Sequence, residues 1–100
     1  MQQVGVLTLP NLFQIGSYKV FFWSNENNEP IHVHIVKGKP TQNSTKVWIT
    51  SVGGCIVANN ASKIPDNELN KILEIISNQY FFICSAWKKH FVVDEIKYFC

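Results

Sequence analysis

Two histidines two residues apart, His32 and His34, are the residues with the most obvious chemistry in this sequence. Alternate residues of a β-strand point to the same face of a sheet, so the two imidazoles are expected to lie side by side. Imidazole is a common zinc ligand, and a third ligand from Glu29, Glu26 or His90 would make a metal site. The pair is equally suited to general acid–base catalysis, because histidine titrates near neutral pH. The structural alternative is a pair of polar side chains on a solvated strand face.

Other catalytic signatures are missing from the sequence. It contains no Gly-x-Ser-x-Gly, P-loop or Gly-x-Gly-x-x-Gly motif, and its acidic residues are too few and scattered to nominate a catalytic carboxylate pair. The pattern therefore requires no cofactor, although a divalent metal at the histidine pair is one alternative. Whether the protein is an enzyme stays open.

Cysteine usage and hydropathy indicate a cytoplasmic protein. Cys55, Cys84 and Cys100 are odd in number, widely spaced and without a Cys-x-x-Cys pair, which argues against a disulfide framework and a zinc knuckle. Reduced thiols in the cytoplasm are the simplest interpretation. The most apolar stretch, residues 75–87, is interrupted by polar residues and is too short to span a bilayer, so no membrane association is expected.

Length and composition predict one folded domain over residues 1–100. Hydrophobic residues make up 46% of the chain and charged residues 16%, which is typical of a protein with a core rather than a disordered one. The formal net charge of +2 is too mild for a chain dedicated to nucleic acid. All nine basic residues are lysines, so the bidentate forks that arginine offers to phosphate and guanine are absent.

Residues 12–58 are expected to form an antiparallel sheet of three to four strands. Alternating apolar residues and turn signals place the strands in the ranges 18–23, 31–36, 45–50 and, more briefly, 55–57, with Gly16-Ser17 as a bend within an aromatic segment. In the first strand, Tyr18, Val20 and Phe22 are favoured for the buried face over Lys19, Phe21 and Trp23. Connections this short favour a meander, because parallel pairing needs a longer crossover.

Residues 65–91 are expected to form one long helix over the sheet. Apolar residues recur at intervals of one, three or four from Leu69 to Phe91 and stay on one helical stripe. Pro65 suits the first turn of a helix, and a break near Ser77-Asn78 into two helices is the alternative. The fold class is therefore α+β: a meander covered on one face by one long, or broken, C-terminal helix, with residues 92–100 as an extension.

Two surfaces remain after the core is assigned. Ile75, Phe82 and Ala86 form a second apolar strip on the helix, which a protein partner, another copy of the chain or the C-terminal extension would cover. The other surface is the open face of the sheet, with the two histidines and Trp48. A protein partner or homo-oligomer is therefore expected.

A nucleic-acid surface is a weaker alternative. Lys19, Lys37, Lys39 and Lys46 can line one edge of the sheet, where Trp48 or Trp23 would offer a stacking face. We favour a solvated sheet edge protected by lysines against aggregation.

The segment from Lys19 to Ile35 resembles the signature of small bacterial proteins classified as domain of unknown function 4160. It runs from an aromatic strand through Ser24-Asn25-Glu26 to Glu29-Pro30-Ile31-His32-Val33-His34, and Trp87 matches a tryptophan near the end of the family's helix. The resemblance extends from Leu12 to Phe91. The family's second proline is Ile31 here, and a histidine that some members have in the turn corresponds to Asn28, which weakens a three-histidine metal site.

The resemblance implies a small cytoplasmic protein without settled catalytic residues. Members often occur in two-gene arrangements typical of toxin–antitoxin modules. Two hypotheses follow. The favoured one is an interaction module, a toxin–antitoxin-like component. The alternative is a hydrolase, acting on RNA, in which His32 and His34 are catalytic residues or metal ligands.

Overall fold

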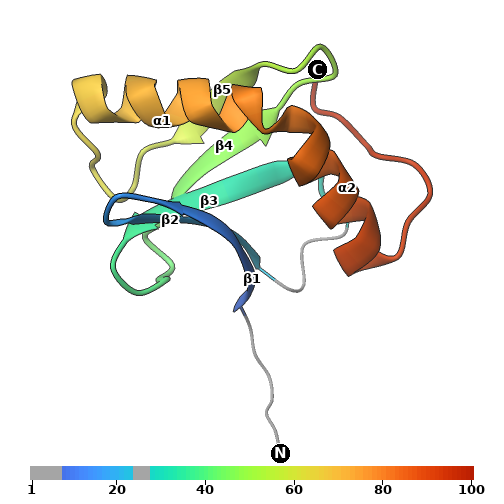
Figure 1. The fold of residues 1–100 in the computed structure, drawn as a ribbon, viewed down its shortest axis with the longest axis horizontal. Coiled ribbons are helices and arrows are strands. Elements are labelled where there is room, and N and C mark those ends of the chain that lie inside the picture. Colours follow the sequence, from blue (N-terminus) through green and yellow to red (C-terminus); the bar gives the residue numbers. More distant parts are fainter. Residues whose placement is uncertain (1–7, 24–27) are drawn as a thin grey trace, which may run out of the picture.

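A computed structural model describes residues 8–23 and 28–100 of the chain, and Figure 1 shows its fold. Five strands precede two helices: β1 (Thr8–Ile15), β2 (Tyr18–Trp23), β3 (His32–Lys37), β4 (Thr45–Ile49), β5 (Cys55–Asn59), α1 (Asp66–Asn78) and α2 (Tyr80–Phe91). The α+β class predicted from the sequence is confirmed. No helix in the described ranges is long and apolar enough to cross a membrane.

The strands form one antiparallel meander in the order β1-β2-β3-β4-β5. This is one strand more than the three to four predicted, because the aromatic segment before Trp23 folds into a hairpin. Gly16 adopts a positive φ of 58°, which glycine accepts without steric cost, and Gly16-Ser17 turn the chain between β1 and β2. As a result β1, and not β2, is the edge strand.

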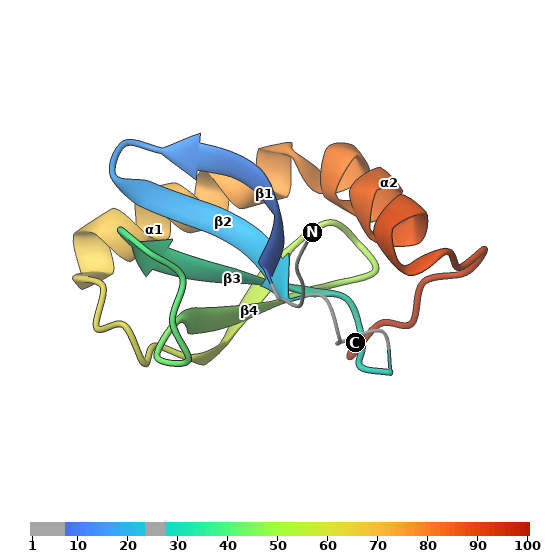
Figure 2. The same ribbon diagram turned by 90° about the horizontal axis from the view of Figure 1, so that it is seen from below.

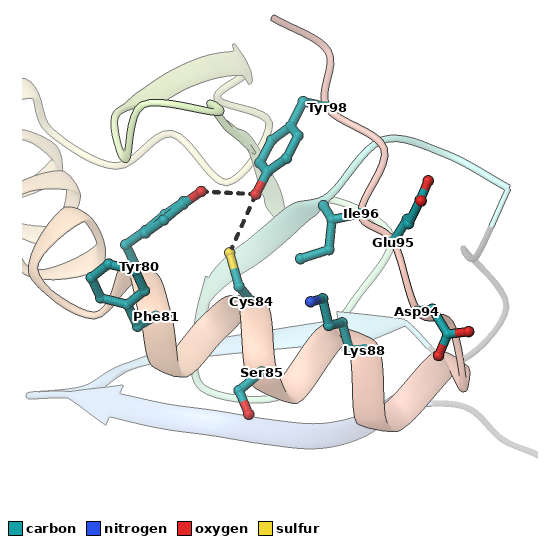
Figure 3. Close-up of a pocket in the computed structure, with 9 residues that line it drawn as sticks. All are labelled: Tyr80, Phe81, Cys84, Ser85, Lys88, Asp94, Glu95, Ile96 and Tyr98. Atoms are coloured by element: carbon teal, nitrogen blue, oxygen red, sulfur yellow. Dashed lines mark hydrogen bonds between the residues drawn. The ribbon is translucent and has the colours of Figure 1, made fainter.

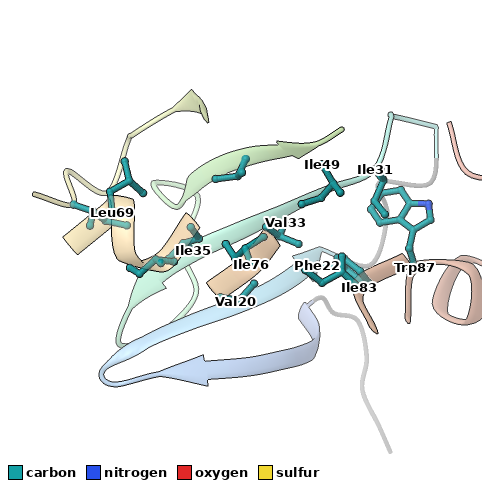
Figure 4. Close-up of a cluster of buried hydrophobic side chains, with 13 residues drawn as sticks. Val20, Phe22, Ile31, Val33, Ile35, Ile49, Leu69, Ile76, Ile83 and Trp87 are labelled. Atoms are coloured by element: carbon teal, nitrogen blue, oxygen red, sulfur yellow. The ribbon is translucent and has the colours of Figure 1, made fainter. Parts of the chain in front are cut away.

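Both helices lie on one face of the sheet (Figure 2), and the core fills the space between the layers. The sheet contributes alternate residues of each strand, and the helices contribute the predicted stripe (Figure 4): Val20, Phe22, Val33, Ile35, Val47, Ile49, Leu69, Ile72, Ile76, Ile83 and Trp87. The preference for burying Val20 and Phe22 against the helices is confirmed. Phe21 is also fully buried, although it projects from the opposite face.

The helical half is broken, as in the alternative prediction, and the expectation of one continuous helix is wrong. Gln79 separates α1 from α2 with φ −102° and ψ 20°, outside the helical range. Its amide still donates to the carbonyls of Ile75 and Ile76, so the break costs little hydrogen bonding. The bend lets α2 turn away from the axis of α1 around the end of the sheet (Figure 1).

Helix α2 ends at a residue in a left-handed conformation. Val92 has φ 54° and ψ 54°, and the amide of Val93 donates to the carbonyl of Lys88 at 3.1 Å. This is the hydrogen bond of a Schellman motif, whose left-handed position glycine usually occupies.

Residues 93–100 then run back past α2 to the end of the sheet where β3 begins (Figure 2). The amide of Ile31 donates to the carbonyl of Lys97 at 2.8 Å, and the amide of Ser51 donates to the main-chain oxygen of Cys100 at 3.0 Å. The extension packs along Tyr80, Cys84 and Lys88 and does not cover the strip of Ile75 and Phe82. Of the three occupants considered for this strip, the extension is therefore not the one that covers it.

Candidate functional site

The histidine pair projects from the face of the sheet opposite the helices, as the strand alternation predicted. The two ring centroids lie 5.0 Å apart with the planes at 84°. The side chains are buried, however: His32 is 0% exposed and His34 is 6% exposed. The expectation of an open, solvated face is wrong at this position, because aromatic side chains surround both rings.

The contacts of His32 include a hydrogen bond to a main-chain carbonyl and two indole rings. Its Nδ1 lies 2.8 Å from the carbonyl oxygen of Pro30, and since a carbonyl only accepts, Nδ1 carries the proton. The ring centroid lies 5.5 Å from Trp48 and 5.5 Å from Trp87. Trp87 comes from α2, which turns around the end of the sheet where β3 begins (Figure 4), and it contacts His32 there.

His34 is enclosed by residues of the neighbouring strands. Its Nδ1 shares a hydrogen bond of 3.1 Å with the hydroxyl of the buried Ser44. The ring stacks on Phe21 with centroids 5.5 Å apart, and Trp23 lies edge-on at 6.1 Å. The antiparallel register that pairs Phe21 with His34 brings these rings together.

These rings form part of a continuous aromatic band, which we define as Trp23, Phe21, His34, His32, Trp48 and Phe99. The last contact is a parallel stack of Trp48 and Phe99, with centroids 4.9 Å apart and planes at 9°. The Nζ atom of Lys46 lies 4.4 Å from the centroid of Trp48. Trp48, predicted as a binding residue, is thus partly covered by the chain's own extension.

The predicted third ligands lie in different places. Glu29 accepts a hydrogen bond from Lys46 Nζ at 2.5 Å, and its side chain is 40% exposed. His90 lies on α2 against Phe22, whose ring faces the core on the helical side of the sheet. Glu26 falls outside the described residues. Within the described ranges no three His, Cys, Asp or Glu side chains are grouped to hold a metal ion, and a metal bound by His32, His34 and Glu29 stays a prediction.

The apolar strip predicted on the helices lines a groove beside the edge strand. Ile75 and Phe82 face Leu12, Phe13 and Ile15 of β1 across a cavity of about 430 Å³, which Gln14 and Gln79 also line. The rings of Phe13 and Phe82 lie 6.2 Å apart, and Phe82 is 48% exposed. Ala86, the third predicted member, packs partly buried against the core instead.

A second cavity, which the sequence did not indicate, lies between α2 and the extension. Its volume is about 620 Å³, and Figure 3 shows its lining: Tyr80, Phe81, Cys84, Ser85, Lys88, Asp94, Glu95, Ile96 and Tyr98. The hydroxyls of Tyr80 and Tyr98 are 2.8 Å apart, and Cys84 Sγ lies 3.8 Å from Tyr98 Oη. Burial, together with these hydrogen bonds, raises the pKa of the Tyr98 phenol far above its usual value.

The chain is thus a two-layer α+β domain that presents an apolar groove and encloses a buried histidine pair. The family described as "domain of unknown function (DUF4160)" matches residues 17–88, and the chain belongs to this family. The resemblance seen in the sequence is confirmed, although the match leaves β1 and the C-terminal extension outside it. No curated protein and no solved structure shows a significant match to the chain.

Proposed function

We propose that the protein is a small cytoplasmic interaction module, a component of a toxin–antitoxin-like pair, and that its partner binds in the groove beside β1. The observation that carries this proposal is the exposed apolar surface of Ile75 and Phe82 opposite Phe13 and Ile15. Such a surface gains free energy when a partner removes it from water. The free thiols of all three cysteines support a reducing compartment.

The position of the groove indicates how a partner would bind. β1 is an edge strand, and an edge strand offers main-chain groups to an added strand. A segment that extends the sheet beside β1 would place alternate side chains toward the helices, where Phe82 and Ile75 lie. We therefore expect an extended partner segment with apolar residues at every second position.

The test is co-expression of the chain with the protein encoded by the adjacent gene, followed by size-exclusion chromatography with light scattering. We expect a stable complex with the wild type and its loss in Phe82→Glu, because a carboxylate would be buried in an apolar groove. Phe81→Glu is the matched control, since Phe81 is the neighbouring aromatic residue, is 84% exposed and does not line the groove. A complex that Phe82→Glu leaves intact would refute the groove as the binding site. The absence of a complex with the wild type would refute the proposal that the two proteins form a pair.

The hydrolase alternative has less support, because both imidazoles are buried by aromatic rings. It requires the two imidazoles to become accessible to a substrate or a metal ion. Calorimetric titration with zinc and manganese tests it, with the variant that carries both His32→Ala and His34→Ala for comparison. Micromolar binding by the wild type that the variant lacks would favour a metal-dependent hydrolase over the interaction module.

A nucleic-acid partner also has little support from the predicted lysines and tryptophans. Lys46 is engaged with Glu29, and one face of Trp48 is stacked against Phe99. Lys37 Nζ lies 5.9 Å from the ring centroid of Tyr18. These contacts occupy groups that a stacked base and its phosphates would need.

A further inference from the structure

The C-terminal extension binds the rest of the fold much as a separate peptide ligand would. The main-chain oxygen of Lys97 accepts a hydrogen bond from the amide of Ile31, and that of Cys100 accepts one from the amide of Ser51. These two hydrogen bonds flank Phe99 in the sequence. Phe99 stacks on Trp48, as described above. Tyr98 shares a hydrogen bond with Tyr80, and Lys97 Nζ donates to the carbonyl of Asn28 at 3.4 Å.

The connection between α2 and the extension is strained. Val92 is β-branched and holds φ 54°, a conformation in which its Cβ crowds the following carbonyl. Its side chain is 88% exposed, so packing does not compensate for the strain. The strain is relieved if the chain straightens at Val92, which would swing residues 93–100 away from their own domain. Strained hinges before a docked segment favour domain swapping.

We propose that two copies of the chain exchange their C-terminal extensions, so that residues 93–100 of each copy occupy the surface formed by Trp48, Tyr80, Ile31 and Ser51 of the other. The exchanged extension makes the same hydrogen bonds and the same Trp48–Phe99 stack as in the monomer. The difference between the two states is therefore the relaxed backbone at two Val92 residues, set against the entropy of association and the loss of the two Val93–Lys88 hydrogen bonds that the left-handed turn makes.

A second copy is the occupant that the contacts describe best. The surface is already complementary, group by group, to Lys97-Tyr98-Phe99-Cys100. Val92 and the extension also lie beyond residue 88, where the family match ends. Exchange of the extension therefore leaves the fold of the matched residues unchanged. This interface is separate from the groove beside β1, and the two proposals can fail independently.

The first experiment measures the dimer fraction of the full chain against concentration by light scattering. We expect dimers from tens of micromolar upward, because tethered segments compete at effective concentrations of about 1 mM and the hinge strain favours exchange. Val92→Gly relieves the strain in the monomer and should weaken dimerisation at least about tenfold. Phe99→Ala removes the same stack from the closed monomer and from the exchanged dimer, so it lowers the stability of both states alike. Phe82→Glu, which alters the groove, should leave dimerisation unchanged.

The second experiment is complementation between two defective copies. The Trp48→Leu variant lacks the indole ring on which Phe99 stacks, and the Phe99→Ala variant lacks the ring of the extension. Neither variant can therefore form the stack by itself. When the two variants are mixed, the intact extension of Trp48→Leu can bind the intact surface of Phe99→Ala. We expect heterodimers by native mass spectrometry with one copy isotope-labelled, at a level well above either homodimer.

Three results would overturn the proposal. The first is a wild type that stays monomeric up to about 1 mM, the effective concentration of the tethered segment. The second is a mixture of Trp48→Leu and Phe99→Ala that forms no more heterodimer than either variant forms homodimer, which would place the contact elsewhere. The third is a monomeric wild type together with a Phe99→Ala variant that binds a synthetic peptide of residues 93–100. The extension would then be a covering segment that a different protein displaces. If Trp48→Leu fails to fold, the comparison of Val92→Gly with the wild type still decides the question.

Discussion

Replacing His32 tests whether the buried histidine pair belongs to the core. His32→Ala removes a fully buried ring that contacts His34, Trp48 and Trp87, and it removes the hydrogen bond to the carbonyl of Pro30. The lost hydrogen bond contributes about 1 kcal/mol. Truncating the ring to a methyl group adds about 2–3 kcal/mol from lost packing and the cavity left behind. We therefore expect the free energy of unfolding to fall by about 3–4 kcal/mol.

Urea unfolding followed by tryptophan fluorescence measures this change directly. A loss of this size lowers the urea midpoint by about 2–3 M, and the melting temperature by roughly 15–25 °C, in a domain of this length. His32→Asn keeps a donor near the position of Nδ1, so it should recover about 1 kcal/mol relative to alanine.

The matched control is Val52→Ala, because Val52 is 92% exposed and its truncation should change stability by less than about 0.5 kcal/mol. A loss below about 1 kcal/mol for His32→Ala would refute the reasoning, because a ring so enclosed cannot be removed without a larger loss of packing. It would also make a catalytic or metal-binding role the better explanation of the pair.

Three further predictions concern stability. Thr45→Val keeps the shape of a fully buried side chain but leaves Asn60 and Ser62 without the hydroxyl they contact, so chemical denaturation should show a loss of about 1–3 kcal/mol. At low protein concentration, Val92→Gly should stabilise the monomer by about 0.5–1 kcal/mol, since relief of the left-handed strain exceeds glycine's added entropy in the unfolded chain. The pKa of Tyr98 is raised in the fold, so its contribution to stability is full below about pH 10 and is lost as the pH rises further. Unfolding at pH 8 and pH 11 should therefore show a smaller alkaline loss in Tyr98→Phe than in the wild type.

Periodicity in the sequence predicted the part of the fold that depends on local geometry. The alternation of Ile31, Val33 and Ile35 with His32 and His34 placed the two sets on opposite faces, because a strand repeats every two residues. The stripe from Leu69 to Phe91 placed both helices over the sheet. The same stripe could not reveal the break, since one non-helical residue at Gln79 hardly changes the spacing of the apolar residues around it.

The candidate sites were only partly predictable. Phe82 and Ile75 were identified as an apolar strip, because they fall outside the main stripe of the helix. Their neighbours across the groove, Phe13 and Ile15, were not identified, since a bend at Gly16-Ser17 does not by itself show that β1 folds back as a separate strand. Burial of the histidines was missed for a related reason. Alternation states which residues share a face and leaves open what covers that face.

The sequence by itself determined the α+β class, the meander, the helical layer, the pairing of His32 with His34 on one face and the family signature. Each of these follows from the spacing of residues close together in the chain, which local backbone geometry converts into a face or a stripe. Only the tertiary structure decided that aromatic rings bury the histidines, that the extension stacks Phe99 on Trp48, and that β1 and the helices enclose a groove. These features join segments that lie far apart in the sequence. They depend on how the layers pack, which no local pattern records.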